Sequence, residues 1–263
     1  MQQQWIEPNF SLIVSAFAAG VLLLVEWRWP NRREAFDPLW IVRAVSLLIV
    51  GMALTALLGD GFAASMESVR LFPGLATALA PTPAWLAGLI GYVAVTFFVY
   101  WWHRARHASG LLWRVFHQVH HSPHRIEVVT AFYAHPADFL ANALIVNAVA
   151  YSLLGLLPSA AVWTAIWVGV FELWEHTNIR TPRWLGYLIV RPEMHRIHHE
   201  LERHTNNFGL PIWDMLFGTY ENTLRQVECG FAPAREARLA AMLACRDVHK
   251  EARGRAGQGM PSG

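Results

Sequence analysis

Trp85 to Trp102 is an apolar stretch without a charged residue, and it leads directly into His103. Its length is close to what an α-helix needs to cross the hydrocarbon core of a bilayer. Four further apolar runs of comparable length occur, at Phe10–Val25, Leu39–Leu58, Phe139–Leu157 and Ala160–Trp174. With 54% hydrophobic and 15% charged residues, the chain is too apolar for an ordinary soluble domain. The sequence therefore predicts an all-α integral membrane bundle with five spanning helices.

Basic residues are distributed unevenly between the two ends of these runs. The loop after the first run carries three arginines, the segment from His103 to Pro136 carries four, and the part after His176 carries twelve Lys or Arg. The N-terminus and the loop that begins at Asp60 carry one between them. By the positive-inside rule, the arginine-rich end is cytoplasmic and the N-terminus lies outside. Five crossings give the same arrangement, so we expect an integral membrane protein with its histidines on the cytoplasmic face.

Eight of the thirteen histidines stand in three blocks: His103 and His107; His117, His120 and His121; and His195, His198 and His199. Positions i, i+3 and i+4 fall on one face of an α-helix, so each block directs its imidazoles to one side. Packing gives no reason for adjacent imidazoles on one face, and we interpret the eight as metal ligands. They exceed what one ion takes and suit two. Iron performs dioxygen chemistry at non-haem sites, and no histidine is expected to act as an acid or a base.

An all-imidazole shell leaves two ferrous ions with a large positive charge, which nearby carboxylates would balance. Glu172 and Glu175, just before His176, are the first candidates. Further candidates are Glu193, Glu200 and Asp214, although each of these acids also suits an ordinary surface or capping role. The two cysteines, Cys229 and Cys245, have no metal-ligand spacing and are predicted to be free thiols.

At these motifs the chain resembles the fatty acid hydroxylase/sterol desaturase superfamily. The three histidine blocks follow the pattern of the three histidine boxes of that superfamily. The resemblance runs from about Trp85 to Tyr220 and is strongest with bacterial sterol-desaturase-like members, which implies a location in a bacterial inner membrane. It includes the stretches His121–His124, Ala134–Pro136, Glu175–Asn178, Asn207–Gly209 and Ile212–Thr219. It implies two iron ions held by His103, His107, His117, His120, His121, His176, His195, His198 and His199.

The resemblance further implies O₂ as a co-substrate, with zinc as a possible substitute for iron in purified protein. No cytochrome b5-like domain is attached, so the electrons would come from a separate ferredoxin- or cytochrome b5-like donor. Two positions depart from the family pattern. Phe208 stands where a tyrosine is expected, and Arg180 stands where one branch of the family has a second histidine after His176.

The domain organisation expected from these patterns has three parts. Residues 1–84 form N-terminal membrane helices and a connecting loop, in which Val69 to Ala80 is a short interfacial helix. Residues 85–225 form the catalytic domain, with amphipathic pieces at Trp184–Val190 and Leu210–Phe217. Residues 226–263 form a polar tail, and the Gly-rich end from His249 to Gly263 is expected to be disordered.

The expected function is a membrane oxygenase that hydroxylates or desaturates a lipid in an apolar slot between the helices, with Trp101, Trp102, Trp167 and Trp174 near its mouth or anchoring the interface. A metal transporter would need ligands along its spans, and those spans have almost none. A zinc-dependent lipid hydrolase would need fewer ligands and a general base. The small net charge of +2 and the lack of a basic run give no case for nucleic acid. The substrate and the roles of His124, His135 and His204 stay open.

Overall fold

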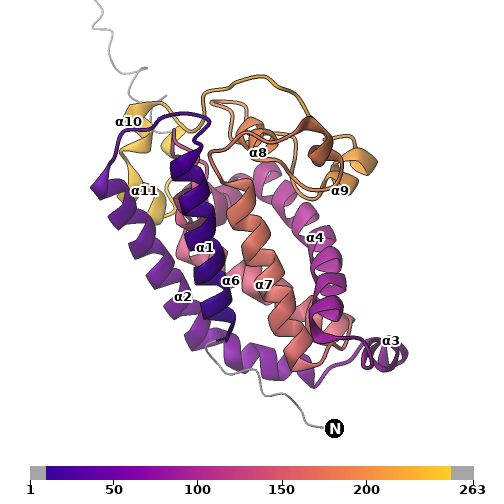
Figure 1. Ribbon diagram of the computed structural model, residues 1–263. Coiled ribbons are helices and arrows are strands. Elements are labelled where there is room, and N and C mark those ends of the chain that lie inside the picture. The colour runs from indigo at the N-terminus through magenta and orange to yellow at the C-terminus, as the bar shows by residue number, and fades with distance from the viewer. Residues whose placement is uncertain (1–9, 250–263) are drawn as a thin grey trace, which may run out of the picture.

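The computed structural model describes residues 10–249. Five long helical segments lie side by side, and consecutive segments run in opposite directions (Figure 1). They are α1 (Phe10–Arg28), α2 (Pro38–Glu67), α4 (Ala84–Ala108), α6 (Pro136–Asn147) with the π-helix η3 (Ala148–Leu153), and α7 (Pro158–Glu175). Several helices begin with proline, whose fixed φ suits the first helical turn. Within residues 10–249 there is no strand, only the isolated bridge between Glu200 and Cys229, so the all-α prediction is confirmed.

Four of the described helical segments are long and apolar enough to cross a membrane. They are Phe10–Arg28, Pro38–Gly59, Ala84–Ala108 and Pro136–Leu153. The fifth predicted span, now α7, is long enough but not apolar enough, because Glu172 and Glu175 stand at its end. It nevertheless packs inside the same bundle, against α1 and α4.

Glycines let α4 and α7 approach closely. A Cβ at Gly88 would lie 2.4 Å from Trp163 Cβ, and one at Gly91 would lie 2.3 Å from Thr164 Oγ1. The Thr164 hydroxyl lies 3.2 Å from the Gly88 carbonyl, to which it donates. Small residues at a helix crossing are typical of packing in membranes, where backbones must come close to gain contact. This contact fixes the two helices whose ends carry His103 and His176.

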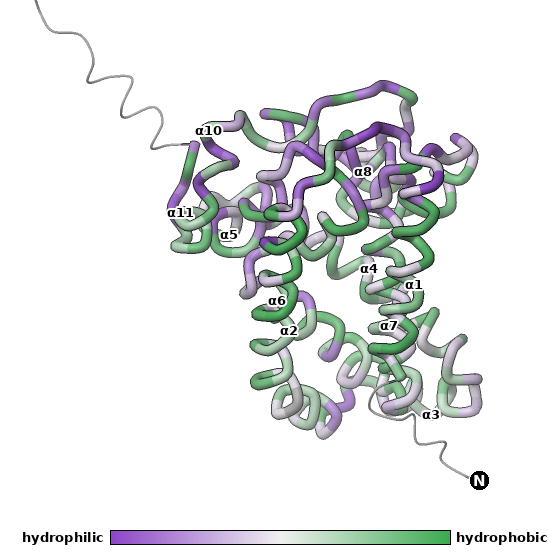
Figure 2. Tube along the Cα trace, turned by 60° about the vertical axis from the view of Figure 1, so that its left-hand side comes forward, coloured by the Kyte–Doolittle hydropathy of each residue, from purple (hydrophilic) through white to green (hydrophobic). Residues whose placement is uncertain are grey.

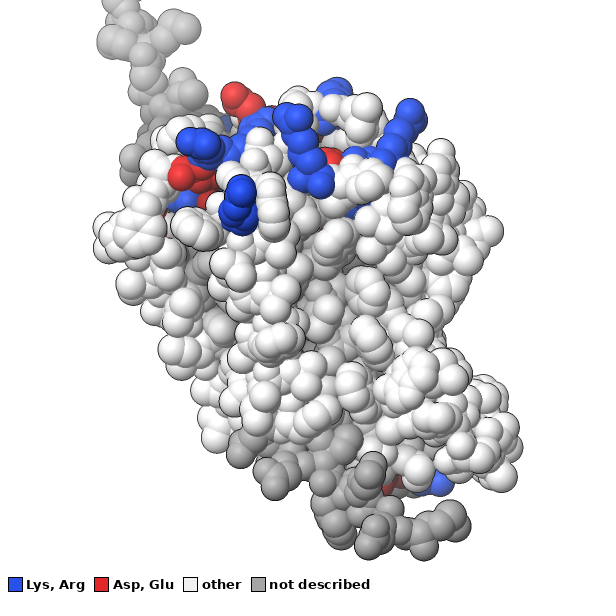
Figure 3. Space-filling model, in the orientation of Figure 1, with Lys and Arg blue, Asp and Glu red and all other residues white. Residues whose placement is uncertain are grey.

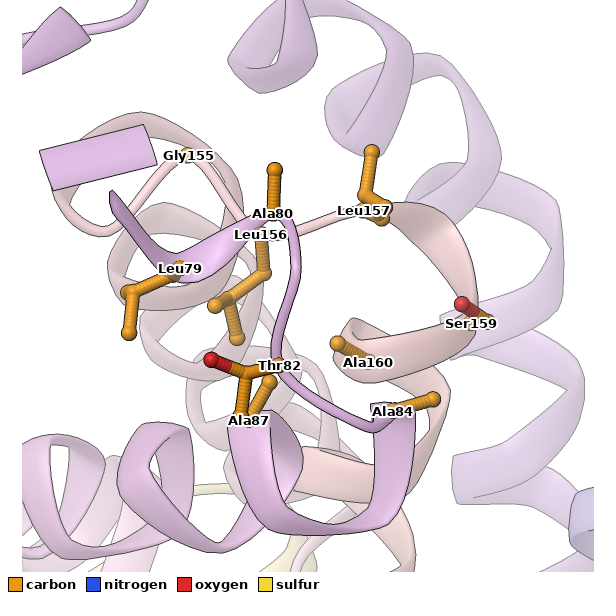
Figure 4. A pocket seen from close by; sticks show the side chains of 10 residues that line it. All are labelled: Leu79, Ala80, Thr82, Ala84, Ala87, Gly155, Leu156, Leu157, Ser159 and Ala160. Atoms are coloured by element: carbon orange, nitrogen blue, oxygen red, sulfur yellow. The ribbon is translucent and has the colours of Figure 1, made fainter. Parts of the chain in front are cut away.

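The predicted loop from Asp60 to Ala84 is partly wrong. Helix α2 continues to Glu67, because the residues after Gly61 are mostly good helix formers and the first proline is Pro73. The short helix α3 (Pro73–Leu79) falls within the predicted Val69–Ala80 piece. A cavity of about 80 Å³ lies between α3, the start of α4 and the turn before α7 (Figure 4). This cavity lies at the end of the bundle opposite α8 (Figure 1) and has few polar groups.

Shorter elements form a polar cap at the other end of the bundle. They are α5 (Gly110–Leu112), the π-helix η1 (Trp113–His117), the 3₁₀-helices η2 (Val128–Phe132) and η4 (Arg183–Tyr187), α8 (Pro192–His198), α9 (Pro211–Phe217), α10 (Pro233–Glu236) and α11 (Leu239–Leu243). Of the two predicted amphipathic pieces, Leu210–Phe217 contains α9, whereas Trp184–Val190 is helical only where it overlaps η4, as far as Tyr187. The helices of the bundle are mainly apolar and the cap is polar (Figure 2), and most visible Lys and Arg side chains gather on the cap (Figure 3).

The C-terminal segment of the described chain packs against α2. Phe231, Met242 and Val248 share a buried cluster with Trp40 and Ala44. Residues 250–263, most of the predicted disordered tail, lie outside the described residues. The boundaries proposed for the three parts of the chain stay predictions.

Candidate metal centre

All nine predicted ligand histidines lie in the cap, and their ring nitrogens form two clusters. The five-histidine group consists of His103, His107, His117, His121 and His198. The four-histidine group consists of His120, His176, His195 and His199. Within each group, the ligand nitrogens all lie within 4.8 Å of one another. The structure therefore contains two sites that can each hold a metal ion.

Four segments supply these side chains. Helix α4 brings His103 and His107, η1 and the turn after it bring the second block, α7 ends at His176, and α8 with its C-terminal residue His199 brings the third block. The expected regular helix at the second block is wrong, since His117 ends a π-helix. The next residues form a turn in which His121 N donates to His117 O at 3.2 Å. This turn keeps the i and i+4 imidazoles on the same side.

The Nε2 atoms within each group are spaced like ligands of one ion. In the five-histidine group, the distances are 2.8 Å for His103–His117, 3.0 Å for His117–His121 and 3.1 Å for His121–His198. In the four-histidine group, they are 2.9 Å for His176–His195, 3.0 Å for His195–His199 and 3.3 Å for His120–His176. Imidazole nitrogens bind metals at about 2.0–2.1 Å, so two ligands at right angles lie about 3.0 Å apart.

Backbone carbonyls set the tautomer of three of the clustered histidines. His103 Nδ1 donates to Phe208 O at 2.8 Å, His198 Nδ1 to Asn206 O at 2.7 Å, and His176 Nδ1 to Glu172 O at 2.7 Å. A carbonyl only accepts, so Nδ1 carries the proton and the Nε2 lone pair of each neutral ring is free. His107 Nε2 is buried without any hydrogen-bond partner. These nitrogens fit a metal ion, which needs unprotonated imidazole.

Burial keeps the clustered imidazoles neutral. Desolvation lowers the pKa of His198 to about 3 and that of His176 to about 4. It also lowers the pKa values of His121 and His195 well below their usual value, and neighbouring imidazoles lower them further. Neutral rings at pH 7 are the protonation state that metal binding requires.

Carboxylates approach several ligands from outside the two groups. Glu175 Oε1 lies 3.5 Å from His195 Nδ1, and Glu172 Oε1 lies 3.7 Å from His176 Nδ1. Asp138 Oδ2 lies 3.8 Å from His117 Nδ1 and was missed from the sequence. The sequence feature that could have identified Asp138 is that it is the one acidic residue between Val128 and Phe171. At 3.5–3.8 Å these carboxylates form no direct hydrogen bonds to the rings, but in their ionised form they would offset part of the charge of metal ions held there.

The other acids that were predicted to lie near the metal centre bind other groups. Glu193 pairs with Arg191 and bonds Thr181, while Glu200 pairs with Arg203 and Arg225 at the surface. Asp214 supports the ligand loop, because it accepts the Phe208 and Gly209 N–H groups and the Thr219 hydroxyl. Phe208 lacks the expected hydroxyl, but its carbonyl holds His103 and its ring lies 5.3–5.5 Å from those of His103, His107 and His198.

The three histidines whose roles the sequence left open lie outside both groups. His124 is largely exposed and pairs with Glu236 at 2.9 Å. His135 caps α6, with Nδ1 accepting the Ala137 N–H. His204 packs 5.0 Å from the His121 ring without joining its group, and burial lowers its pKa to about 4. None of the three shares the ligand clusters.

An open cavity of about 650 Å³ reaches the five-histidine group from the cap. Its walls include His107, Trp113, His204 and Phe208. The four tryptophans predicted near the substrate slot lie on the bundle helices. Trp101 is 42% exposed and packs on Phe217, Trp102 packs on Phe116, and the indole N–H groups of Trp167 and Trp174 donate to Trp85 O and Val190 O.

Comparison with known proteins places the centre in a family. The sequence model for fatty acid hydroxylases matches residues 88–219, a range that includes all nine histidines. An ornithine lipid hydroxylase of Rhizobium tropici is 34% identical over 143 residues, which cover 52% of this chain and 42% of that protein. The human alkylglycerol monooxygenase is 28% identical, over 56% of this chain and 32% of its own.

A very-long-chain aldehyde decarbonylase of Oryza sativa subsp. indica is 26% identical, over 54% of this chain and 58% of its own. The chain thus spans between about a third and three fifths of these relatives. No solved structure matches the chain. Because the family match covers half of the sequence and contains both histidine groups, this chain belongs to the fatty acid hydroxylase family, within the fatty acid hydroxylase/sterol desaturase superfamily.

Proposed function

We propose that the protein is a membrane-bound non-haem di-iron oxygenase that hydroxylates or desaturates a lipid, with O₂ as co-substrate and electrons from a separate donor. The observation that carries this proposal is the Nε2 spacing of 2.8–3.3 Å within two groups of neutral imidazoles. Relatives named as lipid hydroxylase and monooxygenase support the reaction class.

One iron ion would be held by the five-histidine group and the other by the four-histidine group. When bound, the iron pair supplies the oxidising chemistry that an unactivated C–H bond requires, which no protein side chain can supply. The imidazoles hold the ions, and the carbonyls of Phe208, Asn206 and Glu172 keep three of the rings in the binding tautomer. Asp138, Glu172 and Glu175 offset part of the positive charge.

The lipid substrate would lie with its chain along the apolar helices and its reacting carbon at the cap. The bundle has apolar outer faces, including Leu12, Ile49 and Val93. Trp101 and Phe217 lie where the bundle meets the cap and suit the membrane interface. Hydroxylation and desaturation use the same metal centre and differ in how the substrate is placed.

The cap would face the cytoplasm of a bacterial cell. It carries most of the Lys and Arg side chains visible in Figure 3, and the positive-inside rule assigns such an end to the cytoplasm. A soluble ferredoxin- or cytochrome b5-like donor could then approach the centre from that side.

Lipid mass spectrometry tests this proposal. Membranes of cells that express the wild-type chain should contain a lipid with one added oxygen or two fewer hydrogens. Cells that express His199→Ala should lack this product, while the exposed His124→Ala variant should retain it. A wild-type protein that binds no iron after anaerobic reconstitution, and that changes no lipid, would refute the proposal.

A further inference from the structure

Each polar group of Asn178 forms a hydrogen bond with a segment that lies about 150 residues earlier in the chain. Its backbone N–H donates to Glu26 Oε2 at 2.7 Å, and its carbonyl accepts from Asn31 N at 2.6 Å. Its side-chain Oδ1 accepts from Arg32 N at 3.1 Å, and its Nδ2 donates to Arg32 O at 2.7 Å. All four kinds of polar group that an asparagine has are therefore bound by residues 26–32, at the end of α1 and in the loop after it.

This segment lies outside the residues that the family model matches. Its Glu26 carboxylate also accepts the Val128 N–H at 3.0 Å, so one oxygen joins α1 to two loops of the cap. The Asn31 side chain accepts from Arg180 Nε at 2.7 Å, which adds a contact just beyond Asn178. Asn178 is 3% exposed, so water does not readily replace these bonds.

His176 is the ligand that depends on this contact. It is the C-terminal capping residue of α7, two positions before Asn178, and its Nε2 lies 2.9 Å from that of His195. Other ligands come in helical blocks that support one another, whereas His176 is the sole member of its block. Residues 177 and 178 therefore help to fix the end of α7 that carries His176, whose ring is also held by the bond from its Nδ1 to Glu172 O.

We propose that residues 26–32 form a clamp that positions His176 in the four-histidine group, so that the N-terminal part of the chain completes one of the two metal sites. Glu26 and Asn178 are positioning residues in this proposal and touch no metal themselves. The inference rests on the proposed metal function of the histidines. The five-histidine group draws no ligand from this region, because its members come from α4, η1 and its following turn, and α8.

The test compares Glu26→Ala and Asn178→Ala with two matched variants. Glu26→Gln retains an oxygen that can accept both N–H groups. Arg33→Ala removes an exposed side chain just after residues 26–32 and no bond to Asn178. If Asn178→Ala does not fold, Asn178→Asp replaces the donor to Arg32 O by a carboxylate oxygen and keeps the acceptor for Arg32 N–H, and it should show the same two losses. Two quantities are measured for each full-length protein in detergent: amide hydrogen exchange of residues 176–180 in the metal-free state, and Fe²⁺ bound per chain after anaerobic reconstitution.

Glu26→Ala and Asn178→Ala should exchange faster at residues 176–180 and should lose about half of the iron that the wild type binds. Glu26→Gln and Arg33→Ala should resemble the wild type in both measurements. Unchanged exchange would overturn the clamp. Faster exchange with full iron content, or with loss of nearly all the iron, would overturn its link to His176. A wild type that binds no iron would refute the proposed function, while the exchange measurement would still decide whether the clamp exists.

Discussion

His120 and His121 are neighbours in the chain, yet their imidazoles belong to different histidine groups. His120 Nε2 lies 3.3 Å from His176 Nε2, while His121 Nε2 lies 3.0 Å from His117 Nε2. His198 and His199 divide in the same way. In each triple block, the first and last histidines share one group and the middle histidine joins the other. Each triple block therefore contributes to both groups. Both sites share η1 with its following turn, and both share α8 with His199.

This division predicts unequal effects of two adjacent substitutions. His120→Ala leaves three histidines in its group, whereas His121→Ala leaves four. We expect His120→Ala to lose iron from one site, and His121→Ala to retain both ions with an affinity lowered by about 10-fold or more. Chelator titration with iron analysis measures both effects, and product formation should fall by about 100-fold or more in each variant.

His124→Ala is the matched control for these two variants, because His124 is an exposed histidine only three residues after His121. It should bind iron like the wild type. Equal iron loss in His120→Ala and His121→Ala would contradict the assignment of the two residues to separate groups.

Asp214 supports the five-histidine group at a distance. It is fully buried and accepts the N–H groups of Phe208 and Gly209 and the Thr219 hydroxyl, while Phe208 O holds His103. Asp214→Ala leaves these donors without an acceptor, so the free energy of unfolding should fall by about 3 kcal/mol. Metal affinity of this group should fall by about 10-fold.

Denaturant unfolding of the metal-free protein and competition with a chelator measure the two effects of Asp214→Ala separately. Asp214→Asn keeps one acceptor oxygen and should show smaller losses in both. A normal metal affinity in Asp214→Ala would show that Phe208 O does not need this support.

The sequence predicted the helices and the clustering of the nine histidines better than it predicted how the clusters divide. Apolar runs locate α1, α2, α4 and α6 because burial in lipid demands long apolar segments. The i and i+4 spacing predicted which imidazoles share a helix face. It did not predict that the middle histidine crosses to the other group, since this depends on how η1 and α8 face each other. Such a relation between distant segments leaves no local pattern.

The remaining differences between the sequence predictions and the structure concern the ends of helices and the contacts between residues far apart in the chain. Helix α2 extends to Glu67, and α7 is less apolar than predicted because of its last residues. Both differences arise at the ends of apolar runs, where composition changes gradually. The contacts of Asn178 with Glu26 and of Asp138 with Arg106 join residues far apart in sequence. The sequence alone does not show which polar residues of this kind pair with each other, because their contacts form only in the folded bundle.

The two cysteines should differ in reactivity. Cys229 is 3% exposed, and burial raises the pKa of its thiol to about 11, whereas Cys245 is partly exposed. Because the thiolate is the reactive form, iodoacetamide at pH 8 should label Cys245 and spare Cys229 in the folded protein. Both should react after denaturation, and mass spectrometry of peptides would detect the difference.

The raised thiol pKa also predicts a pH dependence of stability. The unfolded thiol loses its proton near pH 8.5, whereas the folded thiol keeps it until about pH 11. The contribution of Cys229 to the free energy of unfolding should therefore decline between these values as pH rises. Cys229→Ala should show less decline than the wild type, and equal slopes would contradict the assigned pKa.

Arg106 and Asp138 form a buried ion pair that joins α4 to α6 beside His117, with both Arg106 Nη1 to Asp138 oxygen distances at 2.7 Å. Removing one partner leaves an uncompensated charge in a dry environment, so Arg106→Leu should lower the free energy of unfolding by about 3–5 kcal/mol. The double variant Arg106→Leu/Asp138→Leu should recover most of that loss, because it buries no charge. The double variant still lacks the carboxylate near His117, so its iron affinity should stay below that of the wild type even where its stability returns. Thermal unfolding of the metal-free protein and iron titration separate the two outcomes, and recovery of both together would mean that Asp138 serves the fold alone.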